Sequence, residues 1–410
     1  MKLFIGFFCF FLSSFCISAQ KPTKQEFQIS GAKKYSDKFL DKFLASVSHE
    51  NELEIRQRLS LLPGVNNVQS SKIYNDSAEV FNIELTEGHT LSPWMGLGTV
   101  NSNIWWQVGF LELNALRRAA QLSVAYRQID GKPGGTVYFR DPYGFGINDG
   151  YYGSINRFAS AEPLYFKTEK VFYNYLLNSF ELGYIHHFKP GKAIEFGTSF
   201  FHEKFDKRNI EQAQGPMKVE YNKILLKAQY AVNKRLYYYH QSTGYQYSIV
   251  ATHVSNLQIN DPFFQLTAEY QYYLQATPLL NIACRVNLGI GSFISTPFAP
   301  FIVDSRINIR GIGDRVSRAN SIVVTNLESR LTVYNGTWLA VQANGFVDLG
   351  LWTVPPTAEF NGSTIGSAVF IGGGLRFVQK RAWNRLIRVD YGLGLNLKNS
   401  GIVFGIGQFF

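Results

Sequence analysis

Cysteine is scarce in this chain, which has three among 410 residues. Cys9 and Cys16 lie within the first twenty residues, and only Cys284 lies in the remainder. A mature chain that has lost the first segment can form no intramolecular disulfide and no cysteine-based metal cluster. The seven histidines show no spacing typical of metal ligands. We therefore expect no metal site and no other cofactor.

Long hydrophobic runs are also missing. The most apolar stretch, from Leu3 to Leu12, follows Lys2 and precedes the small and polar residues Ser18-Ala19-Gln20. This order is typical of an export signal, and we predict a signal peptide over residues 1–19. A membrane helix is the alternative, but the run is shorter than the ~20 residues that a helical span needs. No later run is long enough either, which argues against helical membrane spans.

Catalytic motifs are absent as well. The sequence contains no Gly-x-Ser-x-Gly, no Walker loop and no catalytic constellation of histidines. We therefore predict no catalytic residues and a protein that is not an enzyme. The net charge of +10 is scattered along the chain rather than clustered. Because the chain is also expected to be exported, we expect no nucleic-acid partner.

Aromatic residues and glycine, by contrast, are abundant, with 34 Phe, 23 Tyr and 36 Gly. The mean hydropathy is nevertheless close to zero, at −0.08. An exported chain of this kind without helical spans is either a large soluble β-protein or an outer-membrane β-barrel. The positive charge fits both, since both can meet anionic lipid headgroups or phosphorylated sugars.

Residues 25–88 differ in pattern from the rest of the chain. Apolar residues recur at helical spacing in two stretches, and Pro63-Gly64 ends the second of them. The stretches are, in order, "EFQISG" as a strand, "SDKFLDKFLASV" and "ELEIRQRLSLL" as helices, and "VNNVQSSKIYND" and "AEVFNIELTEG" as strands. We predict a small α+β domain with the order strand, helix, helix, strand, strand.

Residues 94–410 alternate between apolar and polar residues in short segments, as the strands of a barrel do. In "FFQLTAEYQYY" Phe264, Leu266 and Tyr270 share one face, and glutamines, Thr and Glu share the other. At roughly 20 residues per strand and connection, this part of the chain predicts about 16 antiparallel strands. The predicted fold is therefore an all-β transmembrane barrel preceded by the small α+β domain.

Charged residues near the end of the chain fall on one face of their strands. The same alternation places Glu328 and Asp348 on the polar faces of two successive segments, which are expected to point into the lumen. The loop before them contains Arg310, and its planar guanidinium suits a bidentate bond to a carboxylate. Gly311 and Gly313 permit a sharp turn at the tip of this loop.

Several segments, taken in order, resemble the Omp85 superfamily, whose members assemble or translocate proteins at outer membranes. They are "YFRDPYGFG" (138–146), "NIRGIG" (308–313), the strand with Glu328, "FVDLG" (346–350), "SAVFIGGGLRF" (367–377), "LIRVDYGLGL" (386–395) and the terminal "GIVFGIGQFF" (401–410). Residues 25–88 resemble one POTRA domain of that superfamily. The ordered set covers nearly the whole mature chain and is far more specific than any single motif.

The resemblance implies roles for particular residues. Arg310 and Gly311 match the family's loop motif, so Arg310 is expected to lock the loop inside the barrel by pairing with Asp348, with Glu328 nearby. Ile312 departs from the aromatic residue that usually follows. A lumenal charge network that only stiffens the barrel is the alternative to a switching role. Two further sets are implied: a terminal recognition signal of Phe404, Gln408 and Phe410, and an early-barrel motif of Asp141 and Pro142, for which a simple turn is the alternative.

The functional expectation is an outer-membrane factor for protein insertion or translocation, whose N-terminal domain lies in the periplasm. It would act by templating client strands at a seam between the first barrel strand, near 94–101, and the last, 401–410. Its expected partners are unfolded outer-membrane or secreted proteins, periplasmic proteins or lipoproteins, and outer-membrane lipids. The alternatives are a passive pore and an anchoring module. A two-partner secretion translocator is less favoured, since those usually carry a plug helix and two POTRA domains.

Overall fold

The computed structural model describes residues 24–410 with eleven gaps. The gaps are 49, 76–77, 101–102, 130, 167–168, 209–214, 293–299, 306, 314–315, 355–363 and 382–384. The predicted signal peptide at 1–19, with Cys9 and Cys16, lies outside the described residues.

The N-terminal part, residues 24–88, is a small α/β module. Its elements are β1 (Lys24–Ser30), α1 (Asp37–Val47), α2 (Glu52–Ser60), β2 (Val65–Asn75) and β3 (Ala78–Glu87), in the order that the apolar spacing predicted. The strands form a sheet of order β1-β3-β2, in which β1 runs parallel to β3. Strand β1 therefore lies at an edge of this sheet.

The local sequence explains why the two helices begin where they do. The side chains of Ser36 and Asn51 accept hydrogen bonds from the backbone N–H groups of Phe39 and Glu54, and so cap α1 and α2. Phe39, Phe43 and other apolar residues of α1 then pack against the sheet in one buried cluster. Because this core is formed within residues 24–88, with Ala119 as its one buried contribution from outside, the module is a packed unit.

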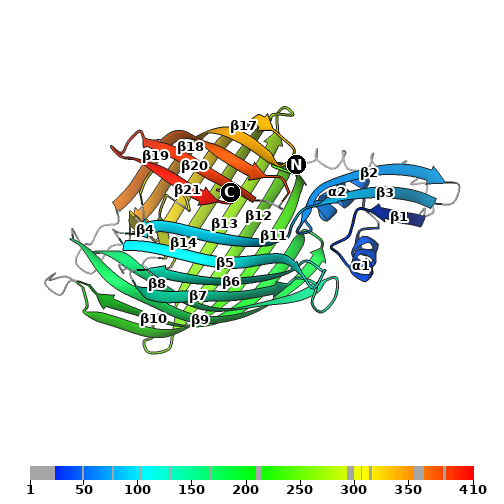
Figure 1. Cartoon of the computed structure of the whole chain (residues 1–410). Helices are drawn as coiled ribbons and strands as arrows, with labels where there is room; N and C mark the ends of the chain where they lie inside the picture. The colour runs from blue at the N-terminus through cyan, green and yellow to red at the C-terminus, as the bar shows by residue number, and fades with distance from the viewer. Residues whose placement is uncertain are drawn as a thin grey trace, which may run out of the picture.

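The rest of the chain forms a 16-stranded antiparallel sheet that rolls up as a barrel, which confirms the predicted fold class and strand number (Figure 1). Its strands are β4 (Leu91–Val100), β5 (Asn103–Ala115), β6 (Ala120–Ile129), β7 (Lys132–Asp141), β8 (Asp149–Phe166), β9 (Glu169–Lys189), β10 (Lys192–Lys207), β11 (Lys218–Tyr238), β12 (Gln241–Asn256), β13 (Phe263–Gln275), β14 (Leu280–Gly291), β17 (Ser321–Asn335), β18 (Leu339–Val354), β19 (Thr364–Gln379), β20 (Arg385–Gly394) and β21 (Ser400–Ile406). Each strand pairs with the barrel strands before and after it in the chain, so that β14 pairs with β17 across the β15–β16 hairpin, and β4 and β21 have one partner each.

The two faces of the sheet differ as the alternation predicted. On β13, Phe264, Leu266 and Tyr270 are exposed on the outer face, whereas Gln271 is buried on the inner face. On β17, Leu327 is exposed outside and Glu328 is buried inside. An apolar outer face around a polar lumen is the pattern of barrels that span membranes. Neither helix in the described residues has the length and apolar character of a membrane-spanning helix.

The sheet has two edges, β4 and β21. No ladder joins these two strands within the described part of the chain. Strand β21 ends at Ile406 rather than at Phe410, which corrects the predicted extent of the last strand. The reason is Gly407, whose φ of +90° turns the chain out of the ladder.

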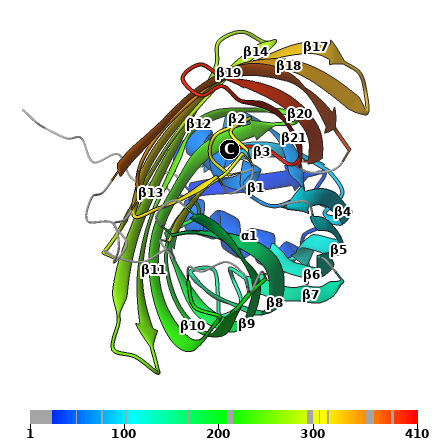
Figure 2. The same ribbon diagram turned by 90° about the vertical axis from the view of Figure 1, so that its left-hand side faces the viewer.

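The α/β module lies at one end of the barrel, which we call the module-side end (Figure 1). Viewed from the other end of the molecule, the module stands behind the ring of strands (Figure 2). The opposite end of the barrel, the far end, carries the connection between β14 and β17. This connection contains a short hairpin of β15 (Phe301–Val303) and β16 (Ser317–Ala319).

Candidate functional site

The loop between β15 and β16 folds back into the barrel and forms the centre of the site. Its turn is closed by the Ser305 N–H, which donates to the Gly313 carbonyl at 2.8 Å. The side-chain oxygen of Asn308 accepts the Asp304 N–H at 2.7 Å. Gly311 and Gly313 have φ angles of +88° and +120°, which only glycine adopts readily. The sharp turn that these glycines predicted is therefore present.

Arg310, at the tip of this loop, is completely buried and bonded to two carboxylates. Its Nε and Nη2 atoms donate to Asp348 Oδ2 and Oδ1, both at 2.9 Å, and its backbone N–H donates to Asp348 Oδ2 at 2.9 Å. Its Nη1 atom donates to Glu328 Oε2 at 2.6 Å. The Arg310 guanidinium also lies 3.6 Å from the centre of the Phe346 ring. We call Arg310, Glu328 and Asp348 the loop lock; the structure brings all three together.

Each carboxylate of the loop lock has further partners. Asp348 Oδ1 accepts a fourth hydrogen bond, from Asn326 Nδ2 at 2.7 Å. Glu328 lies among three arginines, since its Oε1 atom accepts Arg330 Nε at 2.9 Å and also contacts Arg376. Buried charges of opposite sign held by several hydrogen bonds are the arrangement that offsets the cost of removing them from water.

The loop rests on glycines of the surrounding strands. A Cβ atom added at Gly392 of β20 would lie 2.3 Å from the Arg310 carbonyl oxygen. One added at Gly350 of β18 would lie 2.2 Å from Ile309 Cδ1. Larger residues at these two positions would force the loop away from the wall of the barrel.

Apolar side chains anchor the loop beside the loop lock. Ile309 and Ile312 are buried in a cluster with Trp352 and Phe370 of the barrel wall. Ile312, which stands where the Omp85 motif usually has an aromatic residue, therefore still fills a buried apolar position. Its backbone carbonyl accepts Asn399 Nδ2 at 2.8 Å, which ties the loop to the connection between β20 and β21.

The lumen around the loop lock carries an excess of positive charge. Five arginines lie buried there with three acidic residues: Arg285, Arg310, Arg330, Arg376 and Arg388, with Glu328, Asp348 and Asp390. The alternation of polar and apolar residues also places Arg285, Arg330, Glu328 and Asp348 on the polar faces of their strands. Arg376 and Arg388 were missed, although each alternates with outward apolar residues, so the same rule would have found them.

The C-terminus turns into this lumen. Beyond Gly407, the Phe409 ring lies 4.6 Å from the Arg310 guanidinium and 4.8 Å from that of Arg388. The Phe410 ring lies 5.4 Å from the guanidinium of Arg330, which donates to the Phe410 carbonyl at 3.4 Å.

The three residues of the predicted terminal signal are therefore separated. Phe404 is exposed on the outer face of β21, and Gln408 bonds to the buried Arg376. Phe410 is buried in the lumen. A recognition signal that needs all three on one strand face is available only before the barrel has folded.

Asp141 and Pro142 lie at the module-side end, away from the loop lock. Asp141 is the last residue of β7; its carboxylate accepts the Tyr143 N–H at 3.2 Å and pairs with Arg118, and its carbonyl accepts the Gly144 N–H at 3.3 Å. These bonds are those of a turn cap, which agrees with the simple-turn alternative.

Several solved structures resemble this chain in fold, whereas no protein-family model matches it and no curated protein matches it significantly. The structure of BamA from Haemophilus ducreyi lacking POTRA domains 1–3 aligns over 93% of this chain and 84% of its own, with a TM-score of 0.56 at 14% identity. CdiB from Acinetobacter baumannii aligns over 94% of this chain and 73% of its own, with a TM-score of 0.56 at 13% identity. CdiB from Escherichia coli has the same coverage, with a TM-score of 0.58 at 11% identity.

This chain has an Omp85-type barrel fold. The resemblance that the ordered motifs indicated is thus confirmed at the level of the fold. The Omp85-type barrel of this chain is not an empty cylinder, since the loop lock and the C-terminal residues Phe409 and Phe410 lie in its lumen and the module lies across one end.

The module is joined to several turns around the mouth of the Omp85-type barrel. Arg117, in the β5–β6 turn, donates from Nη2 to the carbonyls of Lys33 and Tyr35 at 3.0 and 2.9 Å. On another side, Asn66 Nδ2 donates to the Lys380 carbonyl at 3.1 Å, and its own carbonyl accepts the Tyr239 N–H at 2.9 Å. These contacts tie the module to turns on separate sides of the mouth.

Aromatic packing completes this closure. Tyr143, between β7 and β8, lies with its ring 5.2 Å from that of Phe39 and 6.1 Å from that of Phe43, both on α1. Burial raises the pKa of the Tyr143 hydroxyl well above its ordinary value. Sequence reasoning missed this interface, because no local pattern pairs α1 with a turn a hundred residues away.

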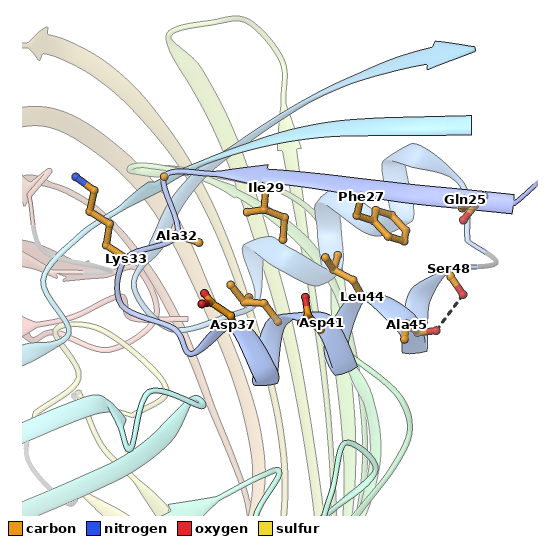
Figure 3. Close-up of a pocket in the computed structure, with 12 residues that line it drawn as sticks. Gln25, Phe27, Ile29, Ala32, Lys33, Asp37, Asp41, Leu44, Ala45 and Ser48 are labelled. Atoms are coloured by element: carbon orange, nitrogen blue, oxygen red, sulfur yellow. Dashed lines mark hydrogen bonds between the residues drawn. The ribbon is translucent and has the colours of Figure 1, made fainter. Parts of the chain in front are cut away.

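The module also carries a groove of about 650 Å³ between β1 and α1 (Figure 3). Phe27 and Ile29 of β1 and Leu44 of α1 line it with apolar surface, and Asp37, Asp41 and Lys33 line it with charge. Because β1 is an edge strand, no strand of the described residues pairs with its outer side, which lies along this groove.

Proposed function

We propose that this protein is an outer-membrane factor that assists the insertion or translocation of other proteins. The fold, with its apolar outer face and polar lumen, supports a place in a membrane crossed by strands. The likeness to BamA and CdiB supports protein clients rather than small solutes.

The outer edges of strands β4 and β21, which no ladder joins within the described residues, carry the proposal. A strand edge presents a row of backbone N–H and C=O groups that can pair with another chain. Strand β21 is short, since it ends at Ile406, and its last four residues are held in the lumen instead. A client strand could therefore pair with β4 without first breaking a long row of hydrogen bonds between β4 and β21.

The connections of the barrel support an orientation with the module in the periplasm. At the module-side end they are short, as at 190–191 and 239–240. The longest connections, at 208–217 and 292–320, lie at the far end, where three others span two residues each. Barrels of bacterial outer membranes have short periplasmic turns and longer extracellular loops.

The module offers a second place for an extended client segment. The open edge of β1 can accept an added strand, and the groove beside it can take apolar side chains. An unfolded client that first binds there would lie close to the mouth of the barrel.

Insertion and translocation are both retained, because the TM-scores for BamA and CdiB are nearly equal, at 0.56 and 0.56–0.58. A passive pore fits less well. The module is bonded across one mouth and the loop lock lies within the lumen, and both features restrict passage. Single-channel recordings would favour the pore if they gave a stable, fully open conductance.

The test is client folding. The mature protein in liposomes is mixed with an unfolded outer-membrane barrel, and protease resistance of the client is followed over time. Liposomes that contain an unrelated folded barrel are the control for lipid disturbance. The proposal expects faster client folding only with this protein; equal rates, with the protein shown to be folded, would contradict insertion and leave translocation to be tested with a secreted client.

A further inference from the structure

A row of mostly polar residues crosses the outer face of the barrel near its far end. Register pairing joins its members from strand to strand: Tyr126, Gly135, Arg157, Asn178, His202 and Asn222, on β6 to β11. Paired residues in an antiparallel sheet lie on the same face. Since Tyr126 is exposed on the outside, the whole row faces outward.

The next outward row, two residues nearer the module, is entirely apolar. Its members are Val124, Val137, Ile155, Phe180, Phe200 and Ile224, joined by the same ladders. All six are exposed, with exposed fractions of 36–63%. The change from an exposed apolar row to a polar row marks the level at which hydrocarbon meets headgroups.

A groove interrupts the wall at this boundary. It has a volume of about 650 Å³ and runs over β6 to β10. Gly135 contributes no side chain to its outward face, and Tyr126, Ile155 and Phe180 are among the residues that line it. Its size is within the range of roughly 300–1,000 Å³ found for small-molecule sites.

Arg157 lies at the polar rim of this groove, and its bonded partners do not neutralise its positive charge. Its Nε atom donates to the Pro133 carbonyl at 3.3 Å, and Nη1 donates to Asn178 Oδ1 at 3.4 Å. Both partners are neutral and both contacts are long. A guanidinium has five N–H donors, so three of them and the positive charge have no partner among the described residues and are left for a ligand.

We propose that this groove binds one phosphate-bearing lipid of the membrane leaflet at the far end. Its phosphate bonds to the Arg157 guanidinium, which suits planar bidentate recognition of phosphate. One acyl chain lies along the groove over Gly135, against Val137, Ile155 and Phe180. The inference rests on the membrane location proposed above, and it is independent of any activity toward clients.

The groove does not include the proposed client edge, and Arg157, on β8, is separated from β4 by three strands. Strands β6 to β10 are separated from β21 along the sheet by the strands from β11 to β20, and from the edge strand β4 by β5. A lipid bound here would fix the height of this wall in the membrane while the two edge strands meet the client.

The test is lipid retention by native mass spectrometry. The mature protein in an uncharged maltoside detergent is titrated with dimyristoyl phosphatidylglycerol, or with the diacylglycerol that has the same chains and no phosphate. Wild type is expected to retain one phosphatidylglycerol about tenfold or more tightly than Arg157→Gln, as expected for loss of a hydrogen bond to a charged group. Val137→Trp, which fills the groove without changing charge, is expected to lose it too.

Lys204→Gln is the matched control. Lys204 lies toward the same end of β10 and is paired with Asp206 at 2.7 Å, outside the groove. It should bind lipid as wild type does, and diacylglycerol should bind weakly to all variants. Equal retention by wild type, Arg157→Gln and Val137→Trp would overturn the proposal in favour of ordinary annular lipid. Client folding by the same samples separates the two claims, because Arg157→Gln should leave that rate unchanged.

Discussion

Replacing Arg310 with alanine is expected to destabilise the barrel more than most single substitutions. The side chain is completely buried and gives three hydrogen bonds, two to Asp348 and one to Glu328. In the variant Asp348 keeps only neutral donors, the backbone N–H of residue 310 and Asn326 Nδ2. Its charge is then buried without a bonded cation.

The expected loss in free energy of unfolding is about 3–5 kcal/mol, the usual cost of removing one member of a buried ion pair. Glu328→Gln should cost at least as much, because Arg310, Arg330 and Arg376 would then lose their shared carboxylate. The double variant Arg310→Ala/Asp348→Ala should cost less than the sum of its single variants by about 2 kcal/mol, since neither partner is left alone.

The assay is urea unfolding of the barrel in detergent micelles, followed by the shift in gel mobility between the folded and unfolded forms. Lys204→Ala is the control, since it removes a surface ion pair with Asp206 that is worth at most about 1 kcal/mol. A loss for Arg310→Ala no larger than that of the control would refute the reasoning. Strict additivity in the double variant would show that Arg310 and Asp348 do not act as a pair.

Three further predictions concern the loop, the C-terminus and the interface with the module. Gly311→Ala should lower the free energy of unfolding by about 1–3 kcal/mol more than Gly131→Ala in the same assay. Both glycines have positive φ, but only at Gly311 would an added Cβ meet backbone, 2.6 Å from the Gly392 carbonyl oxygen. Equal losses of stability in the two variants would exclude close packing as the cause. Phe409→Ala should cost about 3 kcal/mol through lost lumenal packing, whereas Phe404→Ala, on the outer face, should cost far less; the reverse order would contradict the inward C-terminus. Burial, with Lys380 nearby, lowers the pKa of His240 from 6.5 to about 4. The stability that the neutral imidazole contributes is therefore present above pH 6.5 and is lost as the pH falls through about 4. Proteolysis of the chain between the module and the barrel should increase between these pH values in wild type and not in His240→Asn.

The pH effect on His240 has a bounded size. The imidazole is buried in the β11–β12 turn, and its Nε2 atom lies 3.3 Å from Thr332 Oγ1. A proton binds the unfolded chain more tightly than the folded one, so stability falls as pH falls. The difference in pKa corresponds to at most about 3 kcal/mol. A flat profile in wild type would show that His240 is solvated.

The alternation of side chains made much of the barrel predictable. Residues two apart on a strand share a face, so Asn326, Glu328 and Arg330 could be assigned to the lumen from the sequence alone. The structure buries all three. The end of the last strand was less predictable. The alternation continues through Phe404, Ile406, Gln408 and Phe410, and nothing in it indicates that the chain leaves the sheet at Gly407.

Contacts between distant segments could not be read from spacing. The inward position of Phe410 depends on Arg330, eighty residues earlier in the chain. The closure of the mouth depends on Asn66 meeting Lys380, which are 314 residues apart. The pairing of Arg310 with Asp348 is also remote. The alternation placed the carboxylates in the lumen, and the resemblance to a known family indicated that the loop folds back onto them.

The most direct test of the proposed mechanism is disulfide capture of a client at the edge strand. A cysteine replaces Met95 on β4 in a Cys284→Ala background, and a second cysteine lies in the last strand of a stalled client. The control has its cysteine at Leu266, which is exposed on the outer face of the central strand β13. The account predicts a disulfide to the client from position 95 and none from position 266. Equal capture at both positions, or none at 95 while clients still fold faster, would contradict templating at the edge.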